Sequence, residues 1–203
     1  INGSQSVFNG STWNATTGSQ TSITETIGSL TVRDGQFNTG TGSNWTVTGT
    51  GVFDGSTGDS RFVGFSGSSI SFNSLSLTAM TGTTIVSTAD SFVVGGQSTT
   101  ALTTLSVGSG SLTLNGSTLG LNKGINSGEL GSRLILDGNI TTTGSSASLI
   151  ASNNGGIFGI SNILLSSTAG SVARTITTGS GANLTISVPI TNGNATTGGI
   201  IKD

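Results

Sequence analysis

The sequence contains no cysteine, no histidine and no tyrosine, and only 7% of its residues are charged. The absence of cysteine excludes disulfide bonds and thiolate-bound metals. Without cysteine or histidine, the Ser–His and Cys–His arrangements of nucleophilic catalysis are also excluded. Most catalytic sites are built from an imidazole, a thiol or a cluster of carboxylates, so this composition predicts a protein that is not an enzyme and carries no cofactor.

Charge of either sign is scarce, with six basic and eight acidic residues and a formal net charge of −2. The basic residues are scattered along the chain: Arg33, Arg61, Lys123, Arg133, Arg174 and Lys202. Binding to a phosphate backbone requires a patch or stripe of cations, so no nucleic-acid partner is expected. The longest apolar runs, such as residues 92–94 and 163–165, are far too short to cross a bilayer, so no membrane span is expected.

Helix-forming residues are equally scarce. Glu and Lys occur only at Glu25, Glu129, Lys123 and Lys202, whereas glycine occurs 34 times. Each glycine in a helix interior costs about 1 kcal/mol relative to alanine, so no long helix is expected. The low net charge argues against disorder, and 203 residues suit a single domain. The chain does not begin with methionine and shows no signal peptide, which indicates a mature or excised piece of a longer precursor.

A short unit of apolar, small hydroxyl and apolar residues recurs instead. Its copies are Leu30-Thr31-Val32, Trp45-Thr46-Val47, Leu75-Ser76-Leu77, Leu105-Ser106-Val107, Leu112-Thr113-Leu114 and Leu184-Thr185-Ile186. Alternate side chains of a strand face opposite sides, so the outer two residues are expected to point inward and the hydroxyl outward. Residues 134–136 break the pattern with an apolar middle residue, Ile135, and we expect a loop or a neighbouring subunit to cover this unit on both sides. Phe62, Phe65 and Phe72 predict a local hydrophobic plug.

The spacing of these units suggests a repeat. Leu75 to Leu105 and Leu134 to Leu164 are both separated by about 30 residues, a period typical of solenoids. Asn-Gly and Asp-Gly pairs, which tolerate positive φ, follow several units, as at Asn115-Gly116 and Asp137-Gly138. Many units are only three residues long, whereas sandwich strands usually run to about five or six.

We therefore predict an all-β fold, a right-handed parallel β-helix or solenoid, with an antiparallel β-sandwich as the alternative. The expected organisation is one domain over residues 1–203. Residues 28–203 would form the repeat coils, and residues 1–27 would be a cap or a donated strand.

The segment 174–202 contains a more specific pattern. Residues 174–176 read Arg-Thr-Ile, residues 179–186 read Gly-Ser-Gly-Ala-Asn-Leu-Thr-Ile, and residues 198–202 read Gly-Gly-Ile-Ile-Lys. Residues 108–116, Gly-Ser-Gly-Ser-Leu-Thr-Leu-Asn-Gly, form a similar string in mid-chain. The pattern resembles the autotransporter-associated β-strand repeat of large bacterial surface proteins. The resemblance implies a secreted, non-catalytic β-helical stalk, and it transfers no active site.

The densest group of charged residues lies at 54–61, where Asp54, Asp59 and Arg61 stand close together, with Arg33 and Asp34 earlier in the chain. Two carboxylates could cleave a glycosidic bond, and carboxylates with carbonyl groups could bind Ca²⁺. A polar turn with a surface ion pair is the favoured interpretation. No catalytic, cofactor-binding or metal-binding residue is therefore assigned.

Taken together, these features predict a non-enzymatic structural protein of the bacterial cell exterior. Open strand edges template further pairing unless they are blocked, and this chain has few charges to block them. We therefore expect a homo-oligomer or filament that joins end to end into a fibre, sheath or surface layer. The alternative is a passenger fragment of an autotransporter-type adhesin that binds a host surface or a glycan.

Overall fold

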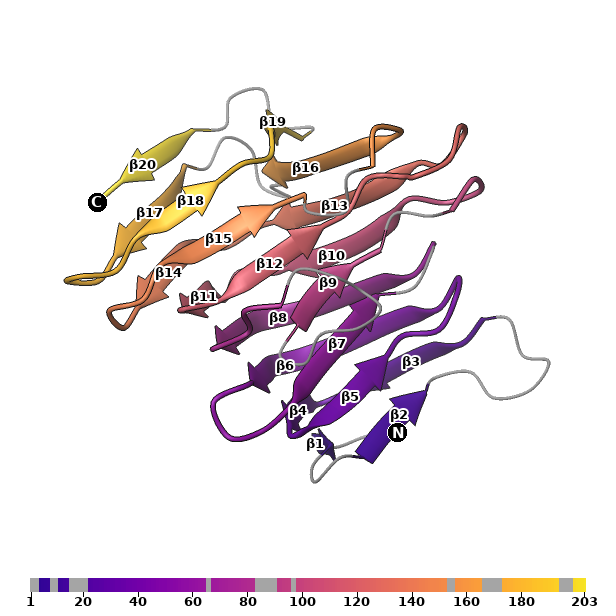
Figure 1. Cartoon of the computed structure of the whole chain (residues 1–203), viewed down its shortest axis with the longest axis horizontal. Helices are drawn as coiled ribbons and strands as arrows, with labels where there is room; N and C mark the ends of the chain where they lie inside the picture. Colours follow the sequence, from indigo (N-terminus) through magenta and orange to yellow (C-terminus); the bar gives the residue numbers. More distant parts are fainter. Residues whose placement is uncertain are drawn as a thin grey trace.

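The computed structural model describes residues 4–7, 11–14, 22–64, 67–82, 91–95, 98–152, 156–165, 173–193 and 199–203, with only the backbone of the first two segments. Every regular element in these residues is a β-strand. The strands lie side by side in a long stack, with the two chain termini at opposite ends (Figure 1).

The strands form a 13-stranded sheet, here sheet A, and a 7-stranded sheet, here sheet B. Sheet A consists of two rows that share the long strands β6 (Asn44–Asp54) and β8 (Ser69–Thr78). The first row continues through β3 (Thr24–Ile27), β10 (Thr103–Val107), β13 (Gly131–Leu136), β16 (Ile160–Leu165) and β19 (Ile190–Asn192). The second row contains β1 (Ser4–Val7), β4 (Ser29–Arg33), β11 (Leu112–Asn115), β14 (Ile140–Thr143), β17 (Arg174–Thr178) and β20 (Ile200–Lys202). Sheet B contains β2 (Ser11–Asn14), β5 (Gly35–Asn38), β7 (Ser60–Gly64), β9 (Ser91–Val94), β12 (Thr118–Leu121), β15 (Ser148–Ala151) and β18 (Leu184–Ile186).

All the strand pairs in the two sheets are parallel. The strand partners that a 30-residue spacing would give are mostly not the ones observed. Leu75 pairs with Leu112 rather than with Leu105. Leu105 pairs with Leu134, and Leu134 pairs with Ile163 rather than Leu164. Apolar, hydroxyl and apolar units match one another in several registers, so their spacing alone does not select the partner.

The predicted right-handed parallel β-helix is wrong for this structure. The prediction relied on three-residue units separated by tight corners, but β6 and β8 run unbroken for 11 and 10 residues and merge two rows into one curled sheet that faces the smaller sheet B. The antiparallel sandwich is also wrong, because the ladders are parallel. All-parallel sheets normally occur in α/β proteins with helices over both faces, but the described residues form no helix.

The bend that curls sheet A lies inside β6, where its register with β8 shifts between Val47 and Thr50. Gly49 occupies this place and donates its backbone N–H to the carbonyl of Gly28 at 2.7 Å. A Cβ at position 49 would lie 2.6 Å from that carbonyl oxygen. Glycine therefore permits a close backbone approach inside a strand, and the sheet curls without ending.

The core lies between the two sheets and is richest in aromatic rings near β5, β7 and β9. Phe62 stacks on Phe92 with ring centroids 4.2 Å apart and on Phe37 at 6.2 Å, while Phe53 from sheet A meets both Phe62 and Phe92 edge-on. The predicted plug thus contains Phe62 and, through Phe53, Phe72. Phe65 lies outside the described residues.

The predicted alternation of the repeated units is confirmed wherever the core is closed. In Leu75-Ser76-Leu77, Leu105-Ser106-Val107 and Leu112-Thr113-Leu114, the apolar residues are buried and the hydroxyl residue is half-buried. Ile135 is half-buried in the single chain. In Leu184-Thr185-Ile186 the apolar residues are only half-buried, because this strand lies near the C-terminal end of the stack.

Candidate functional site

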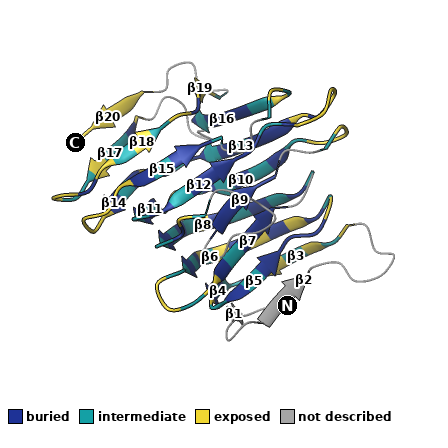
Figure 2. Ribbon diagram, in the orientation of Figure 1, coloured by how far each residue is buried: buried dark blue, intermediate teal, exposed yellow. Residues whose placement is uncertain are grey.

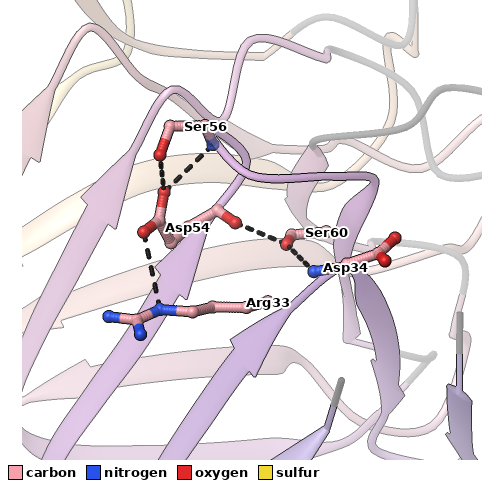
Figure 3. A network of polar contacts seen from close by, with 5 residues as sticks. All are labelled: Arg33, Asp34, Asp54, Ser56 and Ser60. Carbon is pink, nitrogen blue, oxygen red and sulfur yellow. Dashed lines mark hydrogen bonds and ion pairs between the residues drawn. The ribbon is translucent and has the colours of Figure 1, made fainter. Parts of the chain in front are cut away.

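Three of the charged residues singled out in the sequence, Arg33, Asp34 and Asp54, form a polar network with Ser56 and Ser60 (Figure 3). Arg33 and Asp54 are register partners on adjacent strands, and the guanidinium Nε lies 3.5 Å from the carboxylate Oδ2. The other carboxylate oxygen of Asp54 accepts hydrogen bonds from the backbone N–H and the hydroxyl of Ser56, at 3.0 and 2.6 Å. Ser60 donates its hydroxyl to the Asp54 carbonyl at 2.6 Å and accepts the backbone N–H of Asp34 at 2.9 Å.

This geometry is that of a structural turn. Both oxygens of Asp54 already have partners, and Asp59 is exposed and contributes to none of these contacts. Arg61 donates a hydrogen bond from its guanidinium Nη1 to the side-chain carbonyl oxygen of Gln36 at 3.3 Å. In the described ranges no group of three or more acidic residues could hold a metal ion. The hydrogen bonds and the ion pair of Asp54 thus serve to hold the turn.

A second polar cluster closes the loop between β12 and β13. The Glu129 carboxylate accepts the backbone N–H groups of Asn126 and Ile125 at 3.0 and 2.6 Å and the side-chain amide of Asn126 at 2.8 Å. These hydrogen bonds, those of Asn126 first, hold the pKa of Glu129 below its ordinary value. The sequence analysis did not single out this acid, although the Asn-x-x-Glu spacing of residues 126–129 was available as a signal.

This loop pairs with a neighbouring loop and presents apolar side chains to solvent. Gly124 and Phe158 form an antiparallel bridge with hydrogen bonds of 2.9 and 3.1 Å. Ile125, Leu130 and Ile157, the last 76% exposed, project from the two loops. They account for half of the large hydrophobic residues that are exposed in the described part of the chain.

The remaining exposed apolar residues gather at the C-terminal end of the stack, where the core is left open. Ile190, Ile200 and Ile201 are 37%, 40% and 53% exposed, and all residues of β19 and β20 are exposed (Figure 2). An open hollow of about 360 Å³ lies among the last strands, lined by Ile176, Thr178, Leu184, Ile186, Ile190, Ile200 and Lys202. The inward side chains of the last strands are thus poorly covered, whereas those of the central strands are buried.

A buried arginine marks the transition from the closed core to this open end. Arg174 is 5% exposed, lies beside the same group of isoleucines and donates from Nε to the carbonyl of Leu136 at 3.3 Å. Its Nη2 lies 3.6 Å from the carboxylate of Asp137. A buried charge without such partners would be costly. The ion pair of Arg174 with Asp137 thus lies where the buried apolar interior ends.

Comparisons with protein-family models, curated proteins and solved structures find no match. Within the described residues there is no helix that is long and apolar enough to cross a membrane. The candidate functional site is the open end of the stack, formed by β18, β19 and β20.

Proposed function

We propose that this chain is a non-enzymatic structural protein of the bacterial cell exterior that assembles end to end into a fibre, sheath or surface layer. The observation that supports the proposal is the open C-terminal end, where free strand edges flank an uncovered apolar hollow. Unpaired N–H and C=O groups on such edges bind further strands. The resemblance of residues 174–202 to autotransporter-associated repeats favours a location at the cell surface.

Two features of this end support pairing rather than solvent exposure. Natural proteins block free edges with charges, prolines or bulges, but the residues of β18, β19 and β20 include one charge, that of Lys202. Burying apolar surface contributes about 25 cal/mol per Å², so covering Ile190 on β19 would favour association.

Electron microscopy of the purified 203-residue chain tests this proposal. The expected result is filaments or arrays that lengthen as the protein concentration rises. Single particles of one molecule at every concentration would contradict it. A matched variant, Ile190→Asn on β19, is expected to reduce assembly while the far-ultraviolet circular dichroism of the chain stays unchanged.

An adhesin passenger is the second candidate, and the paired loops favour it. Ile125, Leu130 and Ile157 expose three large apolar side chains on the two paired loops. Monomeric proteins rarely expose large apolar patches, and such patches mark interaction sites. Beads coated with the chain would then adhere to host cells or to a glycan array, and Ile125→Ser with Ile157→Ser would abolish the adhesion. Equal adhesion of the variant and the unchanged chain would exclude this surface.

A further inference from the structure

The order of the strands makes the two ends of the stack complementary. The chain visits the second row, sheet B and the first row in a fixed rotation, from β1, β2 and β3 at one end to β18, β19 and β20 at the other. Each end thus offers one strand edge of sheet B and two of sheet A. Since the ladders are parallel, a second copy placed head to tail would continue all of them in the same direction.

The registers also match from end to end. In the first row, the Cα partners run without a break from Thr26 through residues 46, 71, 106, 135 and 164 to Thr191. In sheet B they run from Trp13 through residues 37, 62, 92, 119 and 150 to Ile186. A copy that keeps these registers would place its β3 on β19 and its β2 on β18.

This arrangement leaves one strand too many in the second row. Strands β1 and β20 both belong to that row, β1 beside β4 and β20 beside β17. When β2 and β3 of one copy extend β18 and β19 of another, only one strand fits between β17 of the first copy and β4 of the second. Either β20 or the incoming β1 must occupy it.

Strand β20 is the weaker occupant. It pairs with β17 over three residues, whereas β1 pairs with β4 over four, and all residues of β20 are exposed. The inward register line that runs through Leu112, Ile140 and Ile176 ends at Lys202 in β20. Within the described part of the chain Lys202 makes no ion pair. Covering it would bury an unpaired ammonium, which is costly.

We infer that copies of this chain join head to tail by strand replacement, in which β1 of one copy displaces β20 of the next from the edge of β17. The inference rests on the proposed end-to-end assembly and specifies its joint. Strand β20 then acts as a weak stop that keeps the end of a single molecule partly covered until a second copy arrives.

Cross-linking tests the joint, because the chain has no cysteine of its own. Chains carrying Thr26→Cys are mixed with chains carrying Thr191→Cys and oxidised. Neighbouring strands lie about 4.8 Å apart, within the Cα separation of a disulfide, so the mixture is expected to form a covalent dimer. As a control, Thr46→Cys mixed with Thr191→Cys should form no such dimer, since position 46 lies inside the stack. A dimer formed by Thr191→Cys chains alone would indicate a head-to-head joint and overturn the inference.

Removing residues 199–203 tests the replacement step. The shortened chain lacks the competing strand, so it is expected to assemble faster and at a lower concentration than the full chain. Filaments that form without the Thr26–Thr191 cross-link, or a shortened chain that assembles no faster, would overturn this joint and leave end-to-end assembly standing. Absence of filaments from both chains would contradict the proposed function itself. Circular dichroism of the shortened chain shows whether it still folds. If it does not fold, the cross-link between Thr26→Cys and Thr191→Cys in the full chain tests the joint.

Discussion

Among individual residues, Gly131 has the strictest requirement for its side chain. Its φ is +85°, and a Cβ there would collide with the backbone N and carbonyl O of Ile160 on the adjacent strand β16. We expect Gly131→Ala to lower the free energy of unfolding by about 1–3 kcal/mol from backbone strain alone. Gly199→Ala is the matched control, because a Cβ at position 199 would meet no atom within 4 Å. Denaturant unfolding measures both, and equal midpoints would contradict the close contact between β13 and β16.

The ring of Phe92 makes the closest aromatic contacts of the core, at 4.2 Å from Phe62 and 4.9 Å from Phe53. Phe92→Ala would leave a cavity between the sheets, and we expect a loss of about 3–5 kcal/mol in unfolding free energy. Ile157→Ala, at a residue that is 76% exposed, should change it by less than about 0.5 kcal/mol. Thermal or denaturant unfolding distinguishes the two, and a small effect at position 92 would show that the aromatic stack does not hold the sheets together.

Among the loops, the turn at Asp54 is expected to contribute to stability rather than to catalysis. Asp54→Ala removes the hydrogen bonds to Ser56 and the ion pair with the half-exposed Arg33, for an expected loss of about 1–2 kcal/mol. Asp59→Ala removes an exposed carboxylate that joins none of these contacts, and should have little effect. If the two variants were equally stable, or if either abolished hydrolysis of a polysaccharide, the structural role assigned to Asp54 would be wrong.

The loop closed by Glu129 should respond to acid. Its folded pKa is lowered, so its contribution to loop stability is present above the ordinary value of 4.5 and is lost as the pH falls through the folded pKa. We expect the backbone N–H groups of Ile125 and Asn126 to exchange with solvent faster as the pH drops through this range. Correction for the intrinsic pH dependence of exchange is required, and Glu129→Gln should remove the transition. A transition that persists in that variant would assign it to another group.

The strands show how far the sequence could predict this structure. The inward and outward faces of Leu75-Ser76-Leu77 and Leu112-Thr113-Leu114 follow from side-chain alternation and were predicted correctly. Of the glycines expected at turns, Gly116 has a positive φ of 56°, whereas Gly138 does not. The merging of two rows into β6 and β8 was not predictable, because it depends on the tertiary contact between Gly49 and Gly28. Local patterns specify faces, whereas distant backbone contacts decide where a strand ends.

The candidate site was predictable only in part. The few charges of the chain led us to expect strand edges that are not blocked, but no pattern in residues 190–201 indicates that Ile190 and Ile200 would line an open hollow. That property depends on the position of β19 and β20 at the end of the stack, which is set by the pairing of the whole chain. The acidic residues near position 54 were visible in the sequence, but their structural role was not. That role depends on the register that places Arg33 beside Asp54 on adjacent strands.

Across the whole molecule, two parallel sheets enclose a core that is closed along its length and open at the C-terminal end. The two ends differ, so association through them is heterologous and does not close into a dimer. The assemblies should then grow with protein concentration and reach no preferred final size. A monomeric or dimeric protein would not show this behaviour.

Sedimentation velocity of the full chain over a wide range of concentrations measures this directly. We expect a series of species that grows steadily as concentration rises, and a shift toward the monomer in Ile190→Asn. A single monomer boundary at all concentrations, or a dimer that does not grow further, would contradict it.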